Sequence, residues 1–396
     1  FHSDGERWIQ ENAGLHDPPP VDRADLSAMP DAELAEEITR RATKVQRGLN
    51  LEHGPVFRVI LFDTGPGRTG RLLLAAHHAV IDVVSWRVVA EDLQAACEQA
   101  SRGEPVSLPG KTTSFRHWAE RLAVHAADGG FDAELGYWTA GERRSVAPLP
   151  VDHADGMNTE GFARHLAITL SAEETDALLH VVPKTYGTQI NDALLAALAR
   201  ALQRWSGKAR VLVDLEGHGR EEIFPDMDLS RTVGWFTTVY PVLLDLREAD
   251  GVGGALRAVK EQLRAVPGRG LGYGALRWLG SARRALEEMP HAQLRFEYMG
   301  QIDAGSAPDA ALLVAARESP GVAMSPSAPR SHLIEVSGAV LAGELHMSIR
   351  YSHAIHEHTT IKRLADAYAA ELRALVVHCR GPVYTPSDFP LVEIGQ

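Results

Sequence analysis

Two histidines and an aspartate stand at the end of an apolar run in residues 72–86, LLLAAHHAVIDVVSW. These residue types fit a metal site, a catalytic base with a supporting carboxylate, or polar side chains that close a strand. Zinc needs three or four ligands, and helical zinc motifs place histidines four residues apart. His77 and His78 are adjacent, so a strand points them to opposite faces and at most one can meet Asp82. The spacing disfavours a metal. Two interpretations remain equally supported. Either one histidine carries a proton in catalysis, or the histidine caps the strand and bonds to the backbone.

A second polar cluster, VDLEGHGRE, occupies residues 213–221. Glu216 follows an apolar strand pattern and is bracketed by Gly217 and Gly219, which allow backbone or substrate to approach closely. A carboxylate at a strand end in a partly apolar setting can act as an acid or a base. Taken alone, however, the pattern is more typical of a turn whose charges are solvated.

The glycine-rich segment PGRGLGYG, residues 267–274, invites comparison with a nucleotide-binding loop. Its glycines fall at every second position and not in the order G-x-G-x-x-G. It also follows a predicted helix, whereas a dinucleotide-binding loop follows a strand. The Gly-Lys-Ser/Thr of a phosphate-binding loop is also missing. The segment is therefore predicted to be a flexible or tightly turned loop that binds no cofactor.

The bulk properties are those of an ordinary globular protein. The chain has 396 residues, of which 45% are hydrophobic and 23% charged, and a formal net charge of -12. This length favours two domains or lobes. The negative charge argues against a general nucleic-acid binder and against adsorption to an acidic membrane surface.

The cysteine usage and the ends of the chain predict a location. Two cysteines, Cys97 and Cys379, support neither a zinc knuckle nor a disulfide framework, so a reducing cytoplasm is predicted. No apolar run is long enough to span a bilayer, and the first residues, FHSDGERWIQ, lack the layout of a signal peptide.

Helix and strand patterns alternate in both halves, which predicts an α/β architecture. In the first half, Asp31 is the predicted N-cap of a helix that runs to residue 50. Residues 55–63 and 70–80 are predicted to form a β-hairpin. Ser85 is the predicted cap of a helix over residues 86–100. A polar linker at 145–161 places the predicted lobes at 1–150 and 151–396. The elements predicted beyond it are strands at 162–170, 209–219, 234–246, 292–301 and 332–352, a buried helix at 191–205 and a final helix at 360–379.

Taken in order, the motifs of this chain resemble those of epimerization domains of nonribosomal peptide synthetases, part of the condensation-domain superfamily. The segments that carry the resemblance are HHAVIDVVSWRVVAEDL (77–93), TQINDALLAAL (188–198), DLEGHGRE (214–221), RTVGWFTTVYPV (231–242), PGRGLGYG (267–274), FEYMGQ (296–301) and TPSDFPL (385–391). Each motif is weak alone, and the ordered set is specific. The EGHGRE segment is what separates epimerization domains from ordinary condensation domains.

The resemblance implies a fold and a reaction. It implies two chloramphenicol-acetyltransferase-like lobes that form a V with an active-site tunnel between them. It implies no cofactor of the domain's own and a substrate carried on the 4'-phosphopantetheine arm of a carrier protein. The implied reaction removes the Cα proton of an aminoacyl or peptidyl thioester and returns it to the opposite face, giving an L/D mixture.

The resemblance also assigns roles to residues. It implies Glu216 and His78 as the catalytic pair, with Glu216 moving the Cα proton and His78 as partner acid/base or enolate stabiliser. Tyr298 corresponds to the family's active-site tyrosine and is expected to donate a hydrogen bond. This fits the chemistry, because an α-proton beside a thioester leaves an enolate oxygen to stabilise, and inversion needs proton carriers on both faces.

Other residues are expected to support this pair or to line the tunnel. Asp82 is expected to order the turn of the histidine motif. The remaining supporting residues are His77, His218, Arg220 and Glu297, with His218 and Arg220 expected to orient Glu216, and the expected tunnel residues are Val83, Ser85 and Trp86.

The sequence departs from the family pattern in three places. Val83 replaces the glycine after the motif's aspartate, which obstructs if that position needs a positive φ and otherwise only narrows the tunnel. Glu297 replaces the asparagine of F-N-Y, which puts a carboxylate near a developing enolate. The family also has a further stretch before DGERWIQ, so the N-terminal lobe is expected to lack its first segment in this sequence.

Three functions are compatible with these residues. The first is carrier-protein-dependent epimerization, with an upstream peptidyl carrier protein and, where one follows, a downstream condensation domain as partners. The second is a catalytically impaired domain that docks a carrier protein, which Val83 and Glu297 favour. The third is a condensation-type acyl transferase that uses His78, which the intact DLEGHGRE segment disfavours.

Overall fold

The computed structural model describes residues 1–5, 8–12, 14, 21–302 and 312–379. The chain divides into two compact units. The first unit comprises Phe1–Phe115, Phe224–Phe236 and Ala307–Ser325, and the second comprises Arg116–Ile223, Thr237–Ser306 and Pro326–Gln396. The units are thus discontinuous in sequence, whereas the predicted lobes are continuous and meet at residue 150. Each unit mixes helices with a β-sheet, so the predicted α/β class is confirmed.

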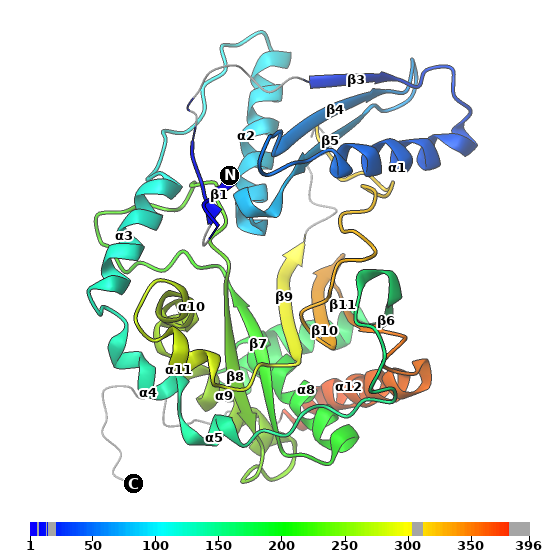
Figure 1. The fold of residues 1–396 in the computed structure, drawn as a ribbon. Coiled ribbons are helices and arrows are strands. Elements are labelled where there is room, and N and C mark those ends of the chain that lie inside the picture. Colours follow the sequence, from blue (N-terminus) through cyan, green and yellow to red (C-terminus); the bar gives the residue numbers. More distant parts are fainter. Residues whose placement is uncertain (6–7, 13, 15–20, 303–311, 380–396) are drawn as a thin grey trace. The chain divides into compact units, whose positions relative to one another are not determined.

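The first unit is built on a small mixed sheet in the order β3 (Val21–Asp25), β4 (Phe57–Asp63) and β5 (Arg71–Ala76). Strands β4 and β5 are antiparallel, as the predicted hairpin requires, and β3 lies parallel to β4. Helix α1 (Asp31–Arg47) runs along one face of this sheet (Figure 1). Its core includes Ile38 and Val45 of the helix and Ile60 and Phe62 of β4.

The remaining described elements of this unit are two short strands, β1 (His2–Ser3) and β2 (Trp8–Ile9), a 3₁₀ turn (His78–Val80) and helix α2 (Val83–Ser101).

Both predicted helix caps in this unit are wrong. Helix α1 begins at Asp31 itself, with Pro30 at the N-cap and no side-chain cap, and the Asp31 carboxylate pairs with Arg68 at 2.8 Å. Helix α2 begins at Val83, and its N-cap is Asp82, whose side chain accepts a hydrogen bond from the Ser85 N–H. An acidic residue followed by an apolar pattern fits the first turn as well as the N-cap, since both positions favour negative charge.

The second unit contains a six-stranded mixed sheet in the order β6-β11-β10-β9-β7-β8. The pairs β7–β9 and β9–β10 are parallel and the other neighbours are antiparallel. The strands are β6 (Ala163–Leu170), β7 (Arg210–Gly217), β8 (Thr238–Asp245), β9 (Leu294–Ile302), β10 (Ile334–Leu341) and β11 (Glu344–Ser352).

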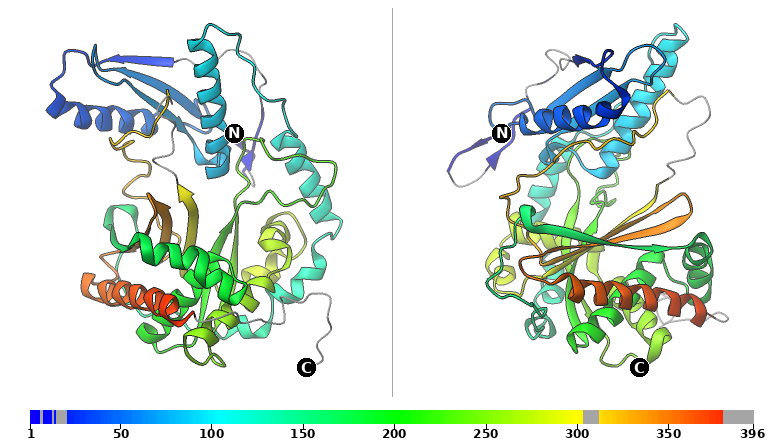
Figure 2. Two further views of the ribbon diagram at one scale, coloured as in Figure 1. Left: turned by 180° about the vertical axis from the view of Figure 1, so that it is seen from behind. Right: turned by 90° about the vertical axis from the view of Figure 1, so that its right-hand side faces the viewer.

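One face of this sheet is buried under helices α8 (Ile190–Ser206), α9 (Gly251–Arg264) and α12 (His358–His378), which are clearly seen in Figure 2. Helix α8 is the predicted buried helix, and ten of its residues are buried, nine of them alanine or leucine between Ala193 and Leu202. The buried carboxylate Glu371 of α12 joins the two helices through Arg200 and Arg204 of α8, each at 2.6 Å.

Shorter helices complete the second unit. They are α3 (Phe115–Ala127, beginning at the last residue of the preceding segment), α4 (Leu135–Trp138), α5 (Gly141–Arg144), α6 (Ala172–Asp176), α7 (Val182–Tyr186), α10 (Leu271–Trp278) and α11 (Arg283–Glu287), with a π-helical turn (Ala177–Val181) and 3₁₀ turns (Asp132–Glu134, Glu160–Phe162 and Pro267–Gly270).

Two predicted elements of the second half differ from the structure. The strand predicted over 234–246 begins only at Thr238, and residues 234–236 belong to the first unit. The segment predicted as a loop over 267–274 is a tight turn that leads directly into α10. In that turn Gly268, Arg269 and Gly270 are all left-handed, with φ of 51°, 50° and 85°. A Cβ on Gly270 would lie 2.0 Å from the Tyr240 ring, so close packing also requires glycine there.

Candidate active site

The histidine motif lies in the first unit, where strand β5 ends and helix α2 begins. Strand β5 ends at Ala76, and His77 is extended. The Nδ1 atom of His77 accepts a hydrogen bond of 3.1 Å from the Ala79 N–H, so His77 caps the 3₁₀ turn. Burial, with a smaller contribution from His78, lowers the pKa of His77. His77 therefore has a local structural bond, while His78 begins the turn.

The hydrogen bond of His78 determines where its ring proton lies. Its Nδ1 atom is 2.8 Å from the carbonyl oxygen of Ile81. A carbonyl oxygen only accepts, so Nδ1 carries the proton and the Nε2 atom of the neutral ring keeps its lone pair. The ring lies against that of Trp235, with centroids 5.3 Å apart. His78 is thus oriented from two sides, with Nε2 as the nitrogen suited to accept or donate a proton.

The buried carboxylate of Asp82 ties the start of helix α2 to the segment that carries Trp235. Its Oδ1 atom accepts from the Ser85 N–H at 2.7 Å, and its Oδ2 atom accepts from the Phe236 N–H at 3.0 Å. Ser85 Oγ donates to the Gly234 carbonyl at 2.9 Å and accepts from the Gly234 N–H at 3.1 Å. These bonds fix Trp235 relative to His78.

Glycine is required at position 234 by close packing. A Cβ there would lie 2.3 Å from the ring of Phe115, whose edge packs against Phe236 at a centroid distance of 5.1 Å. The backbone of residues 234–236 can therefore lie flat against its neighbours only because residue 234 has no side chain.

The three expected tunnel residues all lie in the first turn of helix α2. Val83 is its first residue and 59% exposed, Ser85 is fully buried and Trp86 is half-buried. Val83 has a helical backbone, and the two described non-glycine residues with positive φ are Arg269 and Ala342. A β-branched residue therefore fits this position without backbone strain.

Glu216 lies in the second unit, near the end of strand β7. Its side chain is 18% exposed, and its Oε1 atom accepts a hydrogen bond of 2.8 Å from Nη1 of Arg295 on the neighbouring strand β9. Arg295 is absent from the residues that sequence reasoning selected. A signal for it exists in LRFEY, where a charged residue interrupts an apolar strand next to the buried Phe296.

The residues after Glu216 form a local network of their own. Nδ1 of His218 accepts from the Arg220 N–H at 3.0 Å, and its Nε2 lies 3.4 Å from Glu221 Oε1. Arg269, in the left-handed turn, lies 3.6 Å from Glu221 Oε2. These contacts link the loop of His218 and Arg220 to the glycine-rich turn, while the cation bonded to Glu216 is Arg295.

The two remaining candidates, Glu297 and Tyr298, point to opposite faces of strand β9 because side chains alternate along a strand. Glu297 shares its face with Arg295 and hence with Glu216. Tyr298 shares its face with Phe296 and packs against the hydrophobic core. Its buried hydroxyl has no hydrogen-bond partner among the described residues, and burial raises the pKa of the phenol.

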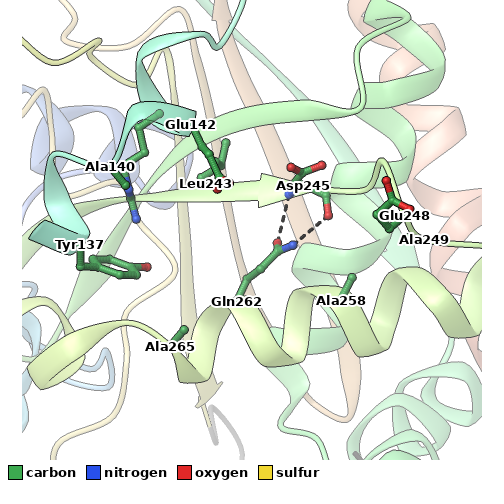
Figure 3. Close-up of a pocket in the computed structure, with 11 residues that line it drawn as sticks. Tyr137, Ala140, Glu142, Leu243, Asp245, Glu248, Ala249, Ala258, Gln262 and Ala265 are labelled. Atoms are coloured by element: carbon green, nitrogen blue, oxygen red, sulfur yellow. Dashed lines mark hydrogen bonds between the residues drawn. The ribbon is translucent and has the colours of Figure 1, made fainter. Parts of the chain in front are cut away.

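A pocket of about 400 Å³ lies elsewhere in the second unit (Figure 3). None of the predicted site residues lines it. Asp245 and Gln262 bridge its centre by bonding to each other, with the Asp245 N–H donating to Oε1 at 3.0 Å and Nε2 donating to the Asp245 carbonyl at 2.8 Å. Its other lining residues are Tyr137, Ala140, Glu142, Arg143, Leu243, Glu248, Ala249, Ala258 and Ala265.

Two further features bear on the possible chemistry. The described part of the chain contains no group of three or more His, Cys, Asp or Glu side chains arranged to hold a metal ion. Within the same residues, no helix combines the length and the apolar character needed to cross a bilayer.

Comparison with known proteins identifies the family. The family model described as the condensation domain matches residues 2–390. Linear gramicidin synthase subunits C and D of Brevibacillus parabrevis are 42% and 43% identical to this chain over alignments that cover 98% of it. Chondramide synthase of Chondromyces crocatus is 41% identical over the whole chain. The chain spans 5%, 8% and 10% of the length of these three relatives.

Solved structures agree with the family assignment. The epimerization domain from the third module of tyrocidine synthetase B is 34% identical, with a TM-score of 0.84 over 93% of this chain and 82% of that domain. The X-domain from teicoplanin biosynthesis is 17% identical, with a TM-score of 0.67 over 92% of this chain and 80% of the other, so it shares the fold. The TPSDFPL motif lies outside the described residues. With a family model that matches nearly its whole length and with these relatives, this chain belongs to the condensation-domain family of nonribosomal peptide synthetases and has its chloramphenicol-acetyltransferase-like fold.

Proposed function

We propose that this chain epimerizes the Cα of an aminoacyl or peptidyl thioester carried on the phosphopantetheine arm of a carrier protein. The observation that carries the proposal is the position of Glu216, the first residue of EGHGRE, near the end of strand β7. A 2.8 Å hydrogen bond from Arg295 on strand β9 holds its side chain. The similarity to the epimerization domain of tyrocidine synthetase B supports it. The domain acts with no cofactor of its own, in the cytoplasm, on an upstream carrier protein and, where one follows, beside a downstream condensation domain.

In the proposed reaction Glu216 accepts the Cα proton as the C–H electron pair moves into the thioester and forms an enolate. The Nε2–H of a protonated His78 then donates to the opposite face of Cα, and the electrons return to the carbonyl. In the reverse direction the two residues exchange roles. Both groups regain their starting protonation states by exchange with solvent, so deuterium from D2O enters at Cα.

Tyr298 has a supporting role in this proposal. Its buried hydroxyl lacks a partner among the described residues, so a hydrogen bond to the reacting complex would compensate the cost of burying it. Glu297 works against the reaction unless its charge is compensated, because a carboxylate near an enolate raises the energy of the transition state.

The experiment loads a carrier protein with an L-aminoacyl-phosphopantetheine thioester and incubates it with this chain in D2O. The released amino acid is analysed for chirality and Cα deuterium. Glu216→Gln and His78→Ala are compared with exposed controls of the same residue types, Glu288→Gln and His180→Ala. D-amino acid with deuterium, lost in the two site variants and kept in the controls, is the expected result.

Two other outcomes would replace the proposal. If the carrier protein binds while neither inversion nor exchange occurs with several amino acids, the chain is a docking domain whose chemistry was lost, with Glu297 as the first residue to revert to asparagine. If a second loaded carrier protein yields an amide product that depends on His78 and not on Glu216, the chain is a condensation-type acyl transferase.

A further inference from the structure

A row of charged side chains crosses the six-stranded sheet of the second unit on the face opposite its hydrophobic core. Strand register aligns Asp214 of β7 with Arg295 of β9, Arg295 with Glu335 of β10, and Glu335 with Arg350 of β11. Alternation puts all four on one face, because Phe296 and its register partners pack into the core on the other. Arg295 therefore stands between two carboxylates in this row and close to a third, Glu216.

The two anions that flank Arg295 in the row have other cationic or hydrogen-bonding partners. Asp214 Oδ2 lies 2.8 Å from Nε2 of His332. Glu335 lies 3.1 Å from both Arg330 and Arg350, whereas its distance from Arg295 is 3.8 Å. The guanidinium of Arg295 thus interacts only weakly with the two carboxylates of the row, Asp214 and Glu335.

Glu216, by contrast, depends on Arg295. Among the described residues, Arg295 is the one hydrogen-bond and ion-pair partner of the Glu216 side chain. The bond engages Oε1 alone, and Oε2 has no hydrogen-bond partner in the described part of the chain. A charge-assisted hydrogen bond to one oxygen fixes the plane of the carboxylate, and the other oxygen stays able to accept a proton.

We propose that Arg295 is the positioning residue for Glu216: it holds this side chain as an oriented carboxylate with Oε2 presented for proton abstraction. The inference rests on the proposed epimerization. It also accounts for the tolerance of Glu297, since Arg295 places a positive charge on the same face of the same strand, two residues before that additional carboxylate. Arg295 thus acts on the reaction through Glu216, and its positive charge offsets the negative charge that Glu297 adds to the same face.

The test measures kcat and KM for Cα deuterium exchange in Arg295→Met, Arg295→Lys and Arg295→Ala. Arg373→Met is the matched control, because it removes another arginine–glutamate pair of the second unit, 2.7 Å from Glu174 on the helices. We expect kcat to fall on the order of tenfold or more in Arg295→Met with KM nearly unchanged, because loss of orientation affects the chemical step. Arg295→Lys keeps most of the activity, and Arg373→Met keeps all of it.

Chemical rescue separates positioning from a merely structural role. Methylguanidinium added to Arg295→Ala is expected to restore exchange in a saturable manner and to have no effect on Glu216→Gln. Circular dichroism and the unfolding midpoint of each variant identify a folding failure. If Arg295→Met fails to fold, Arg295→Lys and the rescue of Arg295→Ala decide.

The results distinguish this inference from the function beneath it. A wild-type chain without exchange overturns the proposed function and this inference with it. Wild-type exchange that persists undiminished in Arg295→Met, or a loss that neither lysine nor methylguanidinium restores, overturns the role of Arg295 alone.

Discussion

The imidazole ring of His78 lies against the indole ring of Trp235, with centroids 5.3 Å apart and planes inclined by 38°. Trp235 is 47% exposed, so the contact is made at the edge of solvent. Contact between two aromatic rings at this distance is attractive and restricts the orientation of the imidazole. The segment 224–236 therefore supplies a ring that orients the histidine.

Replacing Trp235 is expected to slow the reaction without unfolding the chain. A contact between two aromatic rings contributes about 0.5–1.5 kcal/mol, so Trp235→Leu should lower the Cα exchange rate about two- to tenfold. Trp235→Phe should keep most of it, because phenylalanine retains an aromatic face. Deuterium exchange rates are measured beside those of Trp278→Leu, an exposed tryptophan of the second unit. Equal rates for Trp235→Leu and wild type would show that the ring contact has no catalytic role.

Removing the carboxylate of Asp82 is expected to destabilise the first unit. Asp82→Ala takes away the cap of α2 and the carboxylate that accepts from the buried N–H groups of Ser85 and Phe236. We expect a loss of about 2–4 kcal/mol in the free energy of unfolding, from a cap of about 1 kcal/mol and the desolvation of the Phe236 N–H. Urea denaturation gives this value, with the exposed Asp366→Ala as the control. A loss no larger than that of the control would contradict the proposed tie between α2 and residues 234–236.

Tyr298→Phe should separate stability from activity. Removing a buried hydroxyl that has no partner among the described residues relieves its desolvation cost, so the unfolding midpoint should stay the same or rise. If the hydroxyl bonds to the reacting thioester, kcat should fall at the same time. Thermal unfolding and deuterium exchange on one preparation test both effects. A drop in the unfolding midpoint would instead mean that the hydroxyl is satisfied within the folded chain.

His356 is expected to make the second unit acid-sensitive. It is fully buried, and neither ring nitrogen has a hydrogen-bond partner among the described residues. Burial lowers its pKa from the ordinary value of 6.5, an effect opposed by the charge of Asp152. Because the unfolded chain then binds a proton more readily than the folded one, stability is fully present above about pH 6.5 and falls as the pH drops below it.

The measurement for His356 is the urea unfolding free energy between pH 5 and pH 8. His356→Leu should flatten its pH dependence, and His53→Gln, at an exposed histidine, should leave it as in the wild type. An unchanged slope in His356→Leu would assign the acid sensitivity to another group.

The sequence allowed the predicted strands and the long buried helix to be placed because their signals are strong and local. The middle of helix α8, from Ala193 to Leu202, is alanine and leucine apart from Arg200. Strand β10 is mostly apolar, and β11 alternates polar and apolar residues, the period of a strand. Element ends were harder, because several residues near a helix start can serve as cap. Asp82 rather than Ser85 caps α2 since the carboxylate also binds the distant Phe236 N–H, which no local pattern reveals.

The site was predictable to a similar extent. The strand predicted over 70–80 included His78, whereas the structure ends β5 at Ala76 and places His78 in the 3₁₀ turn that follows. Glu216 lies near the end of a strand, as its motif predicts. The partners of these residues were not predictable, because Trp235 and Arg295 come from segments far away in the sequence. Arg295 is joined to Glu216 only by the pairing of β7 with β9, and sequence periodicity does not specify which strands pair.

The discontinuity of the first unit also affects the order in which the molecule can form. Synthesis of the chain produces residues 1–115 before the segments 224–236 and 307–325, which belong to the same unit. Trp235, which contacts His78, and Phe236, whose N–H bonds to Asp82, are thus synthesised only after α-helices α3 to α8 and strands β6 and β7 of the second unit. The first unit can therefore fold completely only after its later segments are synthesised. A fragment that ends at residue 150 would lack Trp235, which packs against His78.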